Sequence, residues 1–343
     1  MNKSDFICKV PFQYTEVHAD QQQFLCCSAW LPTNIYETEN IKDNFLSDKS
    51  NKIRESILDG SYKYCDETQC PYLASLIDGK HLDNKFIPKY RGAPTTRMSE
   101  INFDFDRSCN LQCPSCRIEV INALGNDRKR VDATIEQIEN NYSKELIYIQ
   151  ITSSGDPFYS KSFRQFLINI EPSKYPLLRN IHLHTNALLW TKKLWNKMKN
   201  AQAFINTVEV SIDAATKETY SITRKGGNFD ILLENLKFIT NIDTIGRFIF
   251  SFVVQKDNFR EMKSYVDLIE SYKGLKDKVY KIYFYEVKHW GTWTDEEFKD
   301  KQVSNPNHSL YSEFVEYLDQ VAYHPKVGHN LHEHMTKLTK KLL

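Results

Sequence analysis

The chain has 343 residues, and its 45 Lys and Arg residues against 44 Asp and Glu residues leave a net charge of +1. This balance excludes a general nucleic-acid binder, which carries a marked basic excess, although it leaves open the binding of one defined nucleic acid. The length allows a sizeable core in one large domain with an appended smaller one, and the sequence has no membrane span and no apolar leader, so we expect a cytoplasmic protein.

All eight cysteines lie between Cys8 and Cys116, and the remaining two-thirds of the chain contain none. In a cytosolic protein such clustering favours metal binding over disulfides. Residues 1–95 hold five of them and follow no regular periodicity, so we predict a compact, loop-rich metal-binding module there. The five are Cys8, Cys26, Cys27, Cys65 and Cys70. The segment from Pro88 to Pro94 is typical of a linker.

From about residue 100, strand-like and helix-like segments alternate. The predicted strands are 101–106, 146–152, 181–185, 208–212, 248–254 and 280–287. The predicted helices are 133–143, 163–170, 190–199, 228–240 and 260–272, with a last helix at 311–321. Six alternations indicate an α/β fold with a parallel sheet and are too few for an eight-fold barrel. We therefore predict a partial (β/α)6 barrel over residues 96–300 and a helical extension over 301–343.

Three cysteines, Cys109, Cys113 and Cys116, follow the first of these strands in the run Cys-Asn-Leu-Gln-Cys-Pro-Ser-Cys. Three thiolates so close in sequence can bind one metal centre. Three is one fewer than the number of irons in a cubane cluster, so one iron would stay open for another ligand. The alternative is a zinc site with a fourth ligand elsewhere in the chain.

The strand ending at Asp106, the three-cysteine loop and the six strand–helix units together resemble the radical S-adenosylmethionine (SAM) superfamily, from about Asn102 to Trp293. The resemblance implies that the three cysteines hold a [4Fe-4S] cluster whose open iron binds the amino and carboxylate groups of SAM. Reductive cleavage of SAM would then give methionine and a 5′-deoxyadenosyl radical that abstracts hydrogen from a substrate. In such a division of labour the cofactors supply the chemistry and the protein positions them.

The same resemblance implies a set of SAM contacts near the ends of the strands. The Ser-Gly-Asp-Pro run at 154–157 matches the element that binds the SAM amino group, and a polar turn is the alternative. Ser211 and Asp213 match ribose contacts, although Asp213 could instead cap the next helix. Arg224 would bind the SAM carboxylate. The complete predicted set is Ser154, Gly155, Asp156, Asn186, Ser211, Asp213, Arg224 and Gln255.

The N-terminal cysteines resemble the SPASM/twitch modules that carry auxiliary clusters in this superfamily. The resemblance implies a second [4Fe-4S] cluster held by Cys8, Cys65 and Cys70 together with either Cys26 or Cys27. A structural zinc ion is the alternative, because four thiolates also suit tetrahedral Zn²⁺. The cysteine that is left over, Cys26 or Cys27, is a candidate hydrogen donor.

The function that this resemblance implies first is oxidation or cross-linking of a peptide or protein residue, with the auxiliary cluster as electron relay. A second enzyme hypothesis is an epimerase or dehydrogenase of a sugar-like or aminoglycoside-like small molecule. A third, non-catalytic hypothesis is a zinc-stapled binding scaffold. Both enzyme hypotheses require an electron donor, either a reductase or a carrier of the flavodoxin or ferredoxin type.

Overall fold

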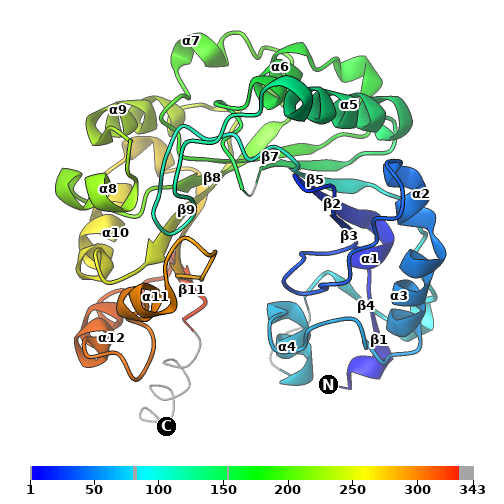
Figure 1. Ribbon diagram of the computed structural model, residues 1–343, viewed down its shortest axis with the longest axis horizontal. Helices are drawn as coiled ribbons and strands as arrows, with labels where there is room; N and C mark the ends of the chain where they lie inside the picture. The colour runs from blue at the N-terminus through cyan, green and yellow to red at the C-terminus, as the bar shows by residue number, and fades with distance from the viewer. Residues whose placement is uncertain (1, 80–82, 153, 332–343) are drawn as a thin grey trace. The chain divides into compact units, whose positions relative to one another are not determined.

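The computed structural model describes residues 2–79, 83–152 and 154–331. It divides into two compact units (Figure 1). Unit 1 comprises residues 1–107, 123–154 and 169–181, and unit 2 comprises residues 108–122, 155–168 and 182–343. The predicted C-terminal extension at 301–343 lies partly outside the described residues, which end at residue 331. The domain boundaries expected at residues 95 and 300 stay predictions.

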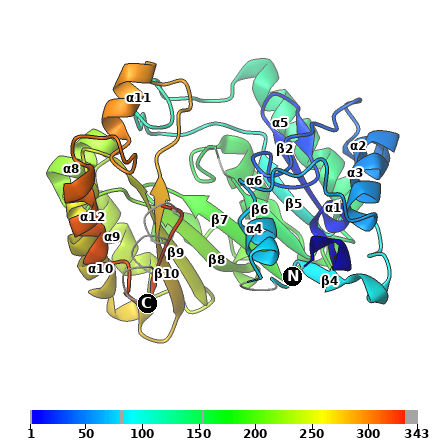
Figure 2. The same ribbon diagram turned by 90° about the horizontal axis from the view of Figure 1, so that it is seen from below.

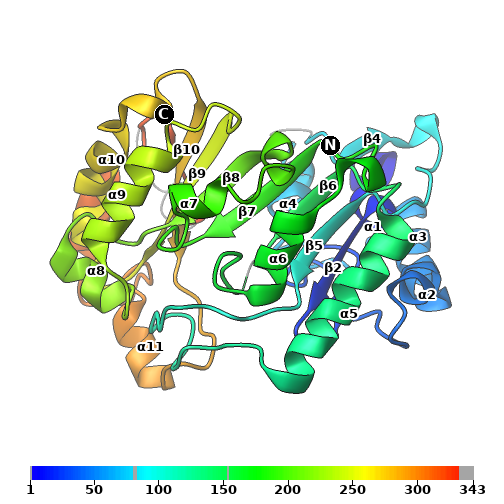
Figure 3. The same cartoon turned by 90° about the horizontal axis from the view of Figure 1, so that it is seen from above.

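Unit 1 combines the N-terminal segment with the first two predicted strands. Its strands are β1 (Phe6–Cys8), β2 (Tyr14–His18), β3 (Gln23–Phe24), β4 (Phe86–Pro88), β5 (Glu100–Asp104) and β6 (Tyr148–Ile151). Its helices are α1 (Val10–Gln13), α2 (Ile41–Leu46), α3 (Asp48–Leu58), α4 (Pro71–Ile77) and α5 (Gly125–Tyr142). The strand order β6-β5-β2-β3 places β2 and β6 parallel to β5, with β3 antiparallel to β2, while β1 and β4 form a separate pair. Figure 3 shows α5 beside β5 and β2.

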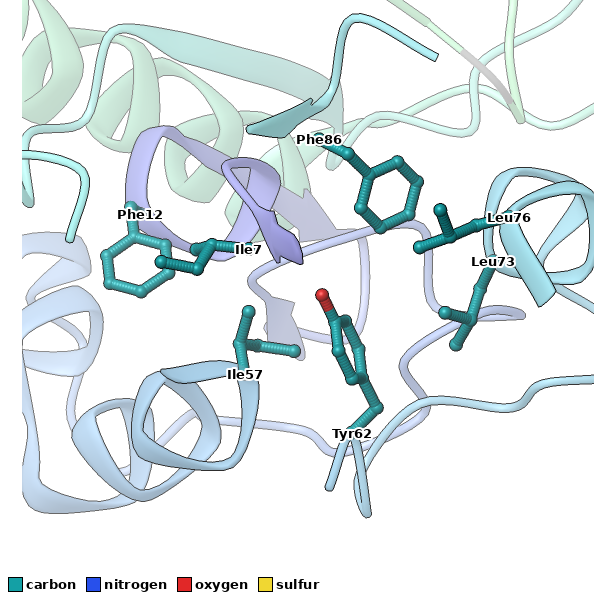
Figure 4. Close-up of a cluster of buried hydrophobic side chains, with 7 residues drawn as sticks. All are labelled: Ile7, Phe12, Ile57, Tyr62, Leu73, Leu76 and Phe86. Atoms are coloured by element: carbon teal, nitrogen blue, oxygen red, sulfur yellow. The ribbon is translucent and has the colours of Figure 1, made fainter. Parts of the chain in front are cut away.

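The N-terminal segment has a small hydrophobic core of its own (Figure 4). The core residues are Ile7, Phe12, Ile57, Tyr62, Leu73, Leu76 and Phe86. The Tyr62 hydroxyl donates a hydrogen bond to the Phe6 carbonyl oxygen at 2.8 Å, so the one polar group of this core is satisfied. Cys8, Cys65 and Cys70 pack against its side. The core therefore brings cysteines from three separate parts of the segment together.

Unit 2 carries the later strand–helix units. Its strands are β7 (Asn180–Thr185, of which the first two residues belong to unit 1), β8 (Ile205–Ser211), β9 (Arg247–Val254), β10 (Val279–Glu286) and β11 (Val327–His329). Its helices are α6 (Lys161–Asn169, whose last residue belongs to unit 1), α7 (Lys192–Trp195), α8 (Lys217–Thr223), α9 (Phe229–Ile239), α10 (Met262–Glu270), α11 (Asp295–Lys301) and α12 (Tyr311–Asp319). The strand order is β11-β10-β9-β8-β7, and β8 to β11 are parallel. All six predicted strands are present, so the α/β class with parallel strands is confirmed.

The two faces of the unit 2 strands differ in chemistry. Helix α10 lies against one face of these strands (Figure 2), and on that face the Phe252 ring of β9 lies 4.9 Å from the Tyr265 ring of α10. Because side chains alternate along a strand, Ser251 points to the opposite face, where it meets Ser211 of β8. Polar groups therefore gather on the face that the helices leave uncovered.

No described helix is long and apolar enough to cross a membrane.

Candidate active site

The cysteine loop of unit 2 is fixed by backbone hydrogen bonds at both of its ends. The Cys109 N–H donates to the Ile121 carbonyl at 2.9 Å, and the Cys116 N–H donates to the Cys113 carbonyl at 2.8 Å. The second of these bonds closes a tight turn from Cys113 to Cys116. Gln112 N–H donates to the carbonyl of Lys225 at 2.9 Å, which ties the loop to the turn after α8.

Each of the three sulfur atoms faces a nitrogen donor from a different part of unit 2. The pairs are Asn186 Nδ2 with Cys109 Sγ at 3.8 Å, Arg224 Nη1 with Cys113 Sγ at 3.7 Å, and Arg117 Nη2 with Cys116 Sγ at 3.3 Å. Two of the three donors carry a positive charge. N–H donors and positive charge stabilise thiolates and tune the reduction potential of a cluster bound through them. This donor set fits an anionic iron–sulfur centre.

Burial controls the protonation of these thiols in the metal-free chain. It raises the pKa of Cys109 to about 11, with a smaller rise from the charge of Asp156 and an opposing effect of Arg117. Burial likewise raises the pKa of Cys113 against the lowering effect of Arg224. Metal ligation requires the thiolate, so incorporation of iron at this loop releases protons.

None of the eight cysteines is in a disulfide. Within the described ranges 2–79, 83–152 and 154–331, no three His, Cys, Asp or Glu side chains are grouped to hold a single metal ion. A cubane does not need that arrangement, because each cysteine binds a different iron. The fit of the loop to a cluster therefore rests on its three thiols, of which Cys109 and Cys113 are buried, and on their three nitrogen donors.

The Asp156 carboxylate, whose predicted contact with the SAM amino group stays a prediction, accepts four hydrogen bonds from protein groups. One oxygen accepts from the N–H groups of Phe158 and Tyr159 at 3.0 and 3.1 Å. The other accepts from Thr185 Oγ1 at 2.7 Å and the Asn186 N–H at 2.9 Å. With 1% of its surface exposed, Asp156 joins the turn after β6 to the end of β7 and holds the main chain of Asn186, whose side chain reaches Cys109 Sγ. It is a positioning residue in this geometry.

Asp213 and Arg224, whose contacts with the ribose and the carboxylate of SAM stay predictions, form an ion pair with each other. Arg224 Nη2 lies 2.8 Å from Asp213 Oδ2, and the Asp213 side chain is 1% exposed. Asp213 also accepts from the Val253 N–H at 2.7 Å and adopts a φ of +61°. Burial lowers the pKa of Arg224, but Asp213 and Cys113 outweigh it and hold that pKa above its ordinary value. The guanidinium thus links the cysteine loop to the end of β8.

Ser211 lies in a short polar chain on the uncovered face. Its hydroxyl is 2.8 Å from His184 Nε2 and 2.9 Å from Ser251 Oγ, and Glu209 Oε1 lies 3.8 Å from His184 Nε2. His184 lies within the predicted strand 181–185 and was not among the predicted contacts. Its partner Ser251 carried no motif and is found only when β8 and β9 pair.

The other predicted contacts are placed as follows. Gln255 is buried after β9, and its N–H donates to Asn258 Oδ1 at 2.8 Å. Asn258, which no sequence motif marked, donates to the carbonyls of Asp213 and Val253 at 3.0 and 2.9 Å. It therefore joins the ends of β8 and β9. Gly155 begins a segment of unit 2, whereas Ser154 ends a segment of unit 1.

The five N-terminal cysteines form a second group of thiols, entirely within unit 1. Burial raises the pKa of Cys8 and of Cys65 to about 12, and the thiols add to one another's shifts. Desolvation raises the pKa of Cys26, although the residue is partly exposed, and the charges of Cys8, Cys27, Cys70 and Cys65 raise that pKa further. Cys70 caps α4, where its sulfur accepts from the Leu73 N–H at 3.4 Å. Four thiols from β1, the loop after β3 and the start of α4 therefore lie within electrostatic reach of one another.

Unit 1 also contains a cavity of about 460 Å³ at the carboxyl ends of β2 and β5. In open α/β sheets ligands bind at such strand ends. Its wall includes His18, whose Nε2 lies 3.0 Å from Glu16 Oε1 and 3.8 Å from Asp104 Oδ2. Burial lowers the pKa of His18, but the Glu16 hydrogen bond and the Asp104 charge outweigh it, so the pKa is raised.

The raised pKa of His18 predicts how the stability of the protein depends on pH. The stabilisation from protonated His18 is complete below pH 6.5, its ordinary pKa, and is lost as the pH rises through the folded value. We expect Glu16→Gln to lower the His18 pKa, as measured by histidine hydrogen–deuterium exchange with mass spectrometry. Glu39→Gln, an exposed change in the same cavity wall, is the control and should leave the pKa in place. An equal pKa in both variants would contradict the assignment.

Residues 105–269 match the sequence profile of the Radical SAM superfamily. Among solved structures, the chain is similar to TYW1 with a bound lysine–pyruvate adduct (15% identity, TM-score 0.38, covering 62% of this chain and 70% of that one). It is also similar to a radical SAM methyltransferase from Sphaerobacter thermophilus (14% identity, TM-score 0.38, covering 65% of this chain and 63% of that one). A third similar structure is anSMEcpe with bound AdoMet (17% identity, TM-score 0.39, covering 63% of this chain and 62% of that one). The chain thus spans less than two thirds of the length of the methyltransferase and of anSMEcpe. No curated protein matches it. The matched segment begins just before the three-cysteine loop and ends in α10.

Proposed function

We propose that this chain is an enzyme that cleaves SAM reductively, with a [4Fe-4S] cluster held by Cys109, Cys113 and Cys116. The observation that carries the proposal is the group of three thiols in one fixed loop, each facing its own nitrogen donor. A cluster bound there supplies the electron that splits SAM into methionine and a 5′-deoxyadenosyl radical, which takes a hydrogen atom from the substrate.

The protein's own contribution is to orient the groups around the loop. Asp156 holds Asn186 beside Cys109, and Asp213 holds Arg224 beside Cys113. Both carboxylates therefore act through another residue. We propose that Ser211 and His184, on the uncovered face of the strands, supply the direct polar contacts to SAM or substrate, since their atoms are bonded only to other polar side chains there.

The experiment that tests the activity is anaerobic reconstitution with iron and sulfide, followed by addition of SAM and dithionite. The expected product is 5′-deoxyadenosine, detected by liquid chromatography with mass spectrometry. A protein with a full complement of cluster iron that forms no 5′-deoxyadenosine would refute the proposal. A protein that takes up zinc in place of iron would instead support the scaffold hypothesis.

For the N-terminal module we propose a second [4Fe-4S] cluster on Cys8, Cys26, Cys65 and Cys70. Support comes from the Cys26 thiol, which is within electrostatic reach of the other three, and from the hydrophobic core that positions Cys8, Cys65 and Cys70. This choice leaves Cys27 as the remaining thiol and as the candidate hydrogen donor.

This ligand set predicts a specific change in iron content. Replacing Cys8, Cys65 and Cys70 with Ala should lower bound iron from about eight to about four atoms per chain, because one of two cubanes is lost. Cys26→Ala should have the same effect on iron content, whereas the neighbouring Cys27→Ala should retain all of the iron. The measurement is colorimetric iron and sulfide analysis of anaerobic protein. Loss of iron in Cys27→Ala but not in Cys26→Ala would reverse the assignment.

With two clusters, the reaction that we propose is oxidation or cross-linking of a peptide or protein residue. An auxiliary cluster held by Cys8, Cys26, Cys65 and Cys70 would accept one electron from a substrate that has lost a hydrogen atom to the deoxyadenosyl radical, and a base would take up the remaining proton. The cavity of about 460 Å³ in unit 1 favours the alternative of a small, sugar-like substrate, because its volume is typical of small-molecule sites. Stimulation of 5′-deoxyadenosine formation by peptide pools or by aminoglycosides would separate the two.

A further inference from the structure

One face of unit 2 is strongly basic although the whole chain carries a net charge of only +1. Residues 157–168 and 187–204 contain no Asp or Glu, and their six basic residues are Lys161, Arg164, Lys192, Lys193, Lys197 and Lys199. These residues lie on α6, on α7 and on the turn that follows α7. The five lysines are exposed. We call this surface the α6–α7 basic face.

The α6–α7 basic face has a shallow apolar hollow at its centre. Arg164, Lys193 and Lys197 line a cavity of about 260 Å³ together with apolar side chains, which are Phe158, Leu189 and Leu194. None of the six basic residues forms an ion pair with a carboxylate of the described residues. An apolar centre surrounded by cationic side chains without ion-pair partners is typical of a protein–protein interface that selects an acidic partner.

A short chain of contacts connects this face to the cysteine loop. Arg164 Nη1 donates to the Phe158 carbonyl at 2.9 Å, and the Phe158 N–H donates to Asp156 at 3.0 Å. Asp156 accepts from the Asn186 N–H at 2.9 Å, and Asn186 Nδ2 reaches Cys109 Sγ at 3.8 Å. Only three residues therefore separate the basic rim from a proposed cluster ligand, which is a short route for an electron.

We propose that the α6–α7 basic face docks an acidic one-electron carrier protein of the flavodoxin type. The inference rests on the proposed function, because only a reductive reaction needs such a partner. One electron leaves the carrier, which is oxidised, and one electron enters the centre at the cysteine loop, which is reduced; no atom is transferred. The unpaired cations select the negative charge of the carrier, and the apolar hollow provides contact over the route to Cys109.

The test uses the reconstituted holoenzyme and an acidic bacterial flavodoxin as the probe. In Lys193→Glu/Lys197→Glu, the rate constant for electron transfer from reduced flavodoxin should fall about tenfold or more at low salt, and the difference should shrink as salt is added. Binding of flavodoxin, measured by calorimetry, should weaken in parallel. Lys193→Ala/Lys197→Ala should give a smaller loss of the same kind.

Two controls make the outcome decisive. Lys273→Glu/Lys276→Glu changes the net charge equally at exposed positions elsewhere in unit 2 and should keep the wild-type rate with flavodoxin. With dithionite in place of flavodoxin, all variants should form 5′-deoxyadenosine at the wild-type rate. If dithionite fails even with the wild type, the proposed function fails, and calorimetry still tests docking. A wild-type flavodoxin affinity in Lys193→Glu/Lys197→Glu, or binding of tRNA rather than flavodoxin at this face, would overturn the inference.

Discussion

Simultaneous replacement of Cys109, Cys113 and Cys116 with Ala is expected to abolish formation of 5′-deoxyadenosine. The three sulfurs supply all of the protein ligands that the loop offers to a cluster, and the nitrogen donors from Asn186, Arg224 and Arg117 cannot replace them. Iron bound by the N-terminal module should remain. Cluster absorbance, iron analysis and the 5′-deoxyadenosine assay under dithionite measure the effect.

The matched control for this variant lies in the same loop. Ser115 sits between Cys113 and Cys116 and is buried, yet it offers no thiolate. Ser115→Ala should therefore keep both the cluster and the activity. Wild-type 5′-deoxyadenosine formation by the triple Ala variant would show that SAM is cleaved elsewhere in the molecule.

The second large effect is expected at the buried ion pair. Arg224→Met leaves the Asp213 carboxylate in place, almost fully buried and without its positive partner. Removing one partner of a buried pair costs about 3–5 kcal/mol of unfolding free energy. Anaerobic urea denaturation followed by circular dichroism measures this loss. The variant also removes the donor to Cys113, so a lower reduction potential should accompany the loss of stability.

A double-mutant cycle separates the ion pair from simple loss of packing. Asp213→Asn combined with Arg224→Met should be more stable than Arg224→Met alone, because no unpaired charge then remains buried. The control is the exposed ion pair of Lys217 with Asp230, in which Lys217 Nζ lies 2.7 Å from Asp230 Oδ2. Lys217→Met should change the unfolding free energy far less, since solvent screens that pair. Equal losses at the two sites would contradict the burial argument.

The periodicity of the sequence was sufficient to predict the parallel strands, because burial on both faces leaves apolar runs such as Phe248 to Val254. It was less informative for helices. The predicted helix at 190–199 is α-helical only over Lys192–Trp195, since the following residues form separate turns. Helix α5 begins at Gly125, eight residues before the predicted start at 133, because its first two turns are charged and show no apolar period.

The spacing of Cys109, Cys113 and Cys116 alone predicted a metal-binding loop, because all of its ligands lie within eight residues. The contacts of Asp156 and Asp213 could not be predicted in this way. Their partners, Asn186 and Arg224, are distant or on other elements, and a motif gives the residue without its neighbour. Asn258 carried no motif at all, since its role is to bond main-chain carbonyls that only the folded strands bring together.

The pairing of β2 with β5 has a consequence for where this protein can be shortened. β2 lies along the full length of β5, from Tyr14 opposite Glu100 to His18 opposite Asp104. A chain that started at residue 96 would expose the N–H and carbonyl groups of β5 along a free edge, which is a template for self-association. The segment from residue 96 onward is therefore not autonomous, because its solubility depends on β2, a strand far earlier in the sequence.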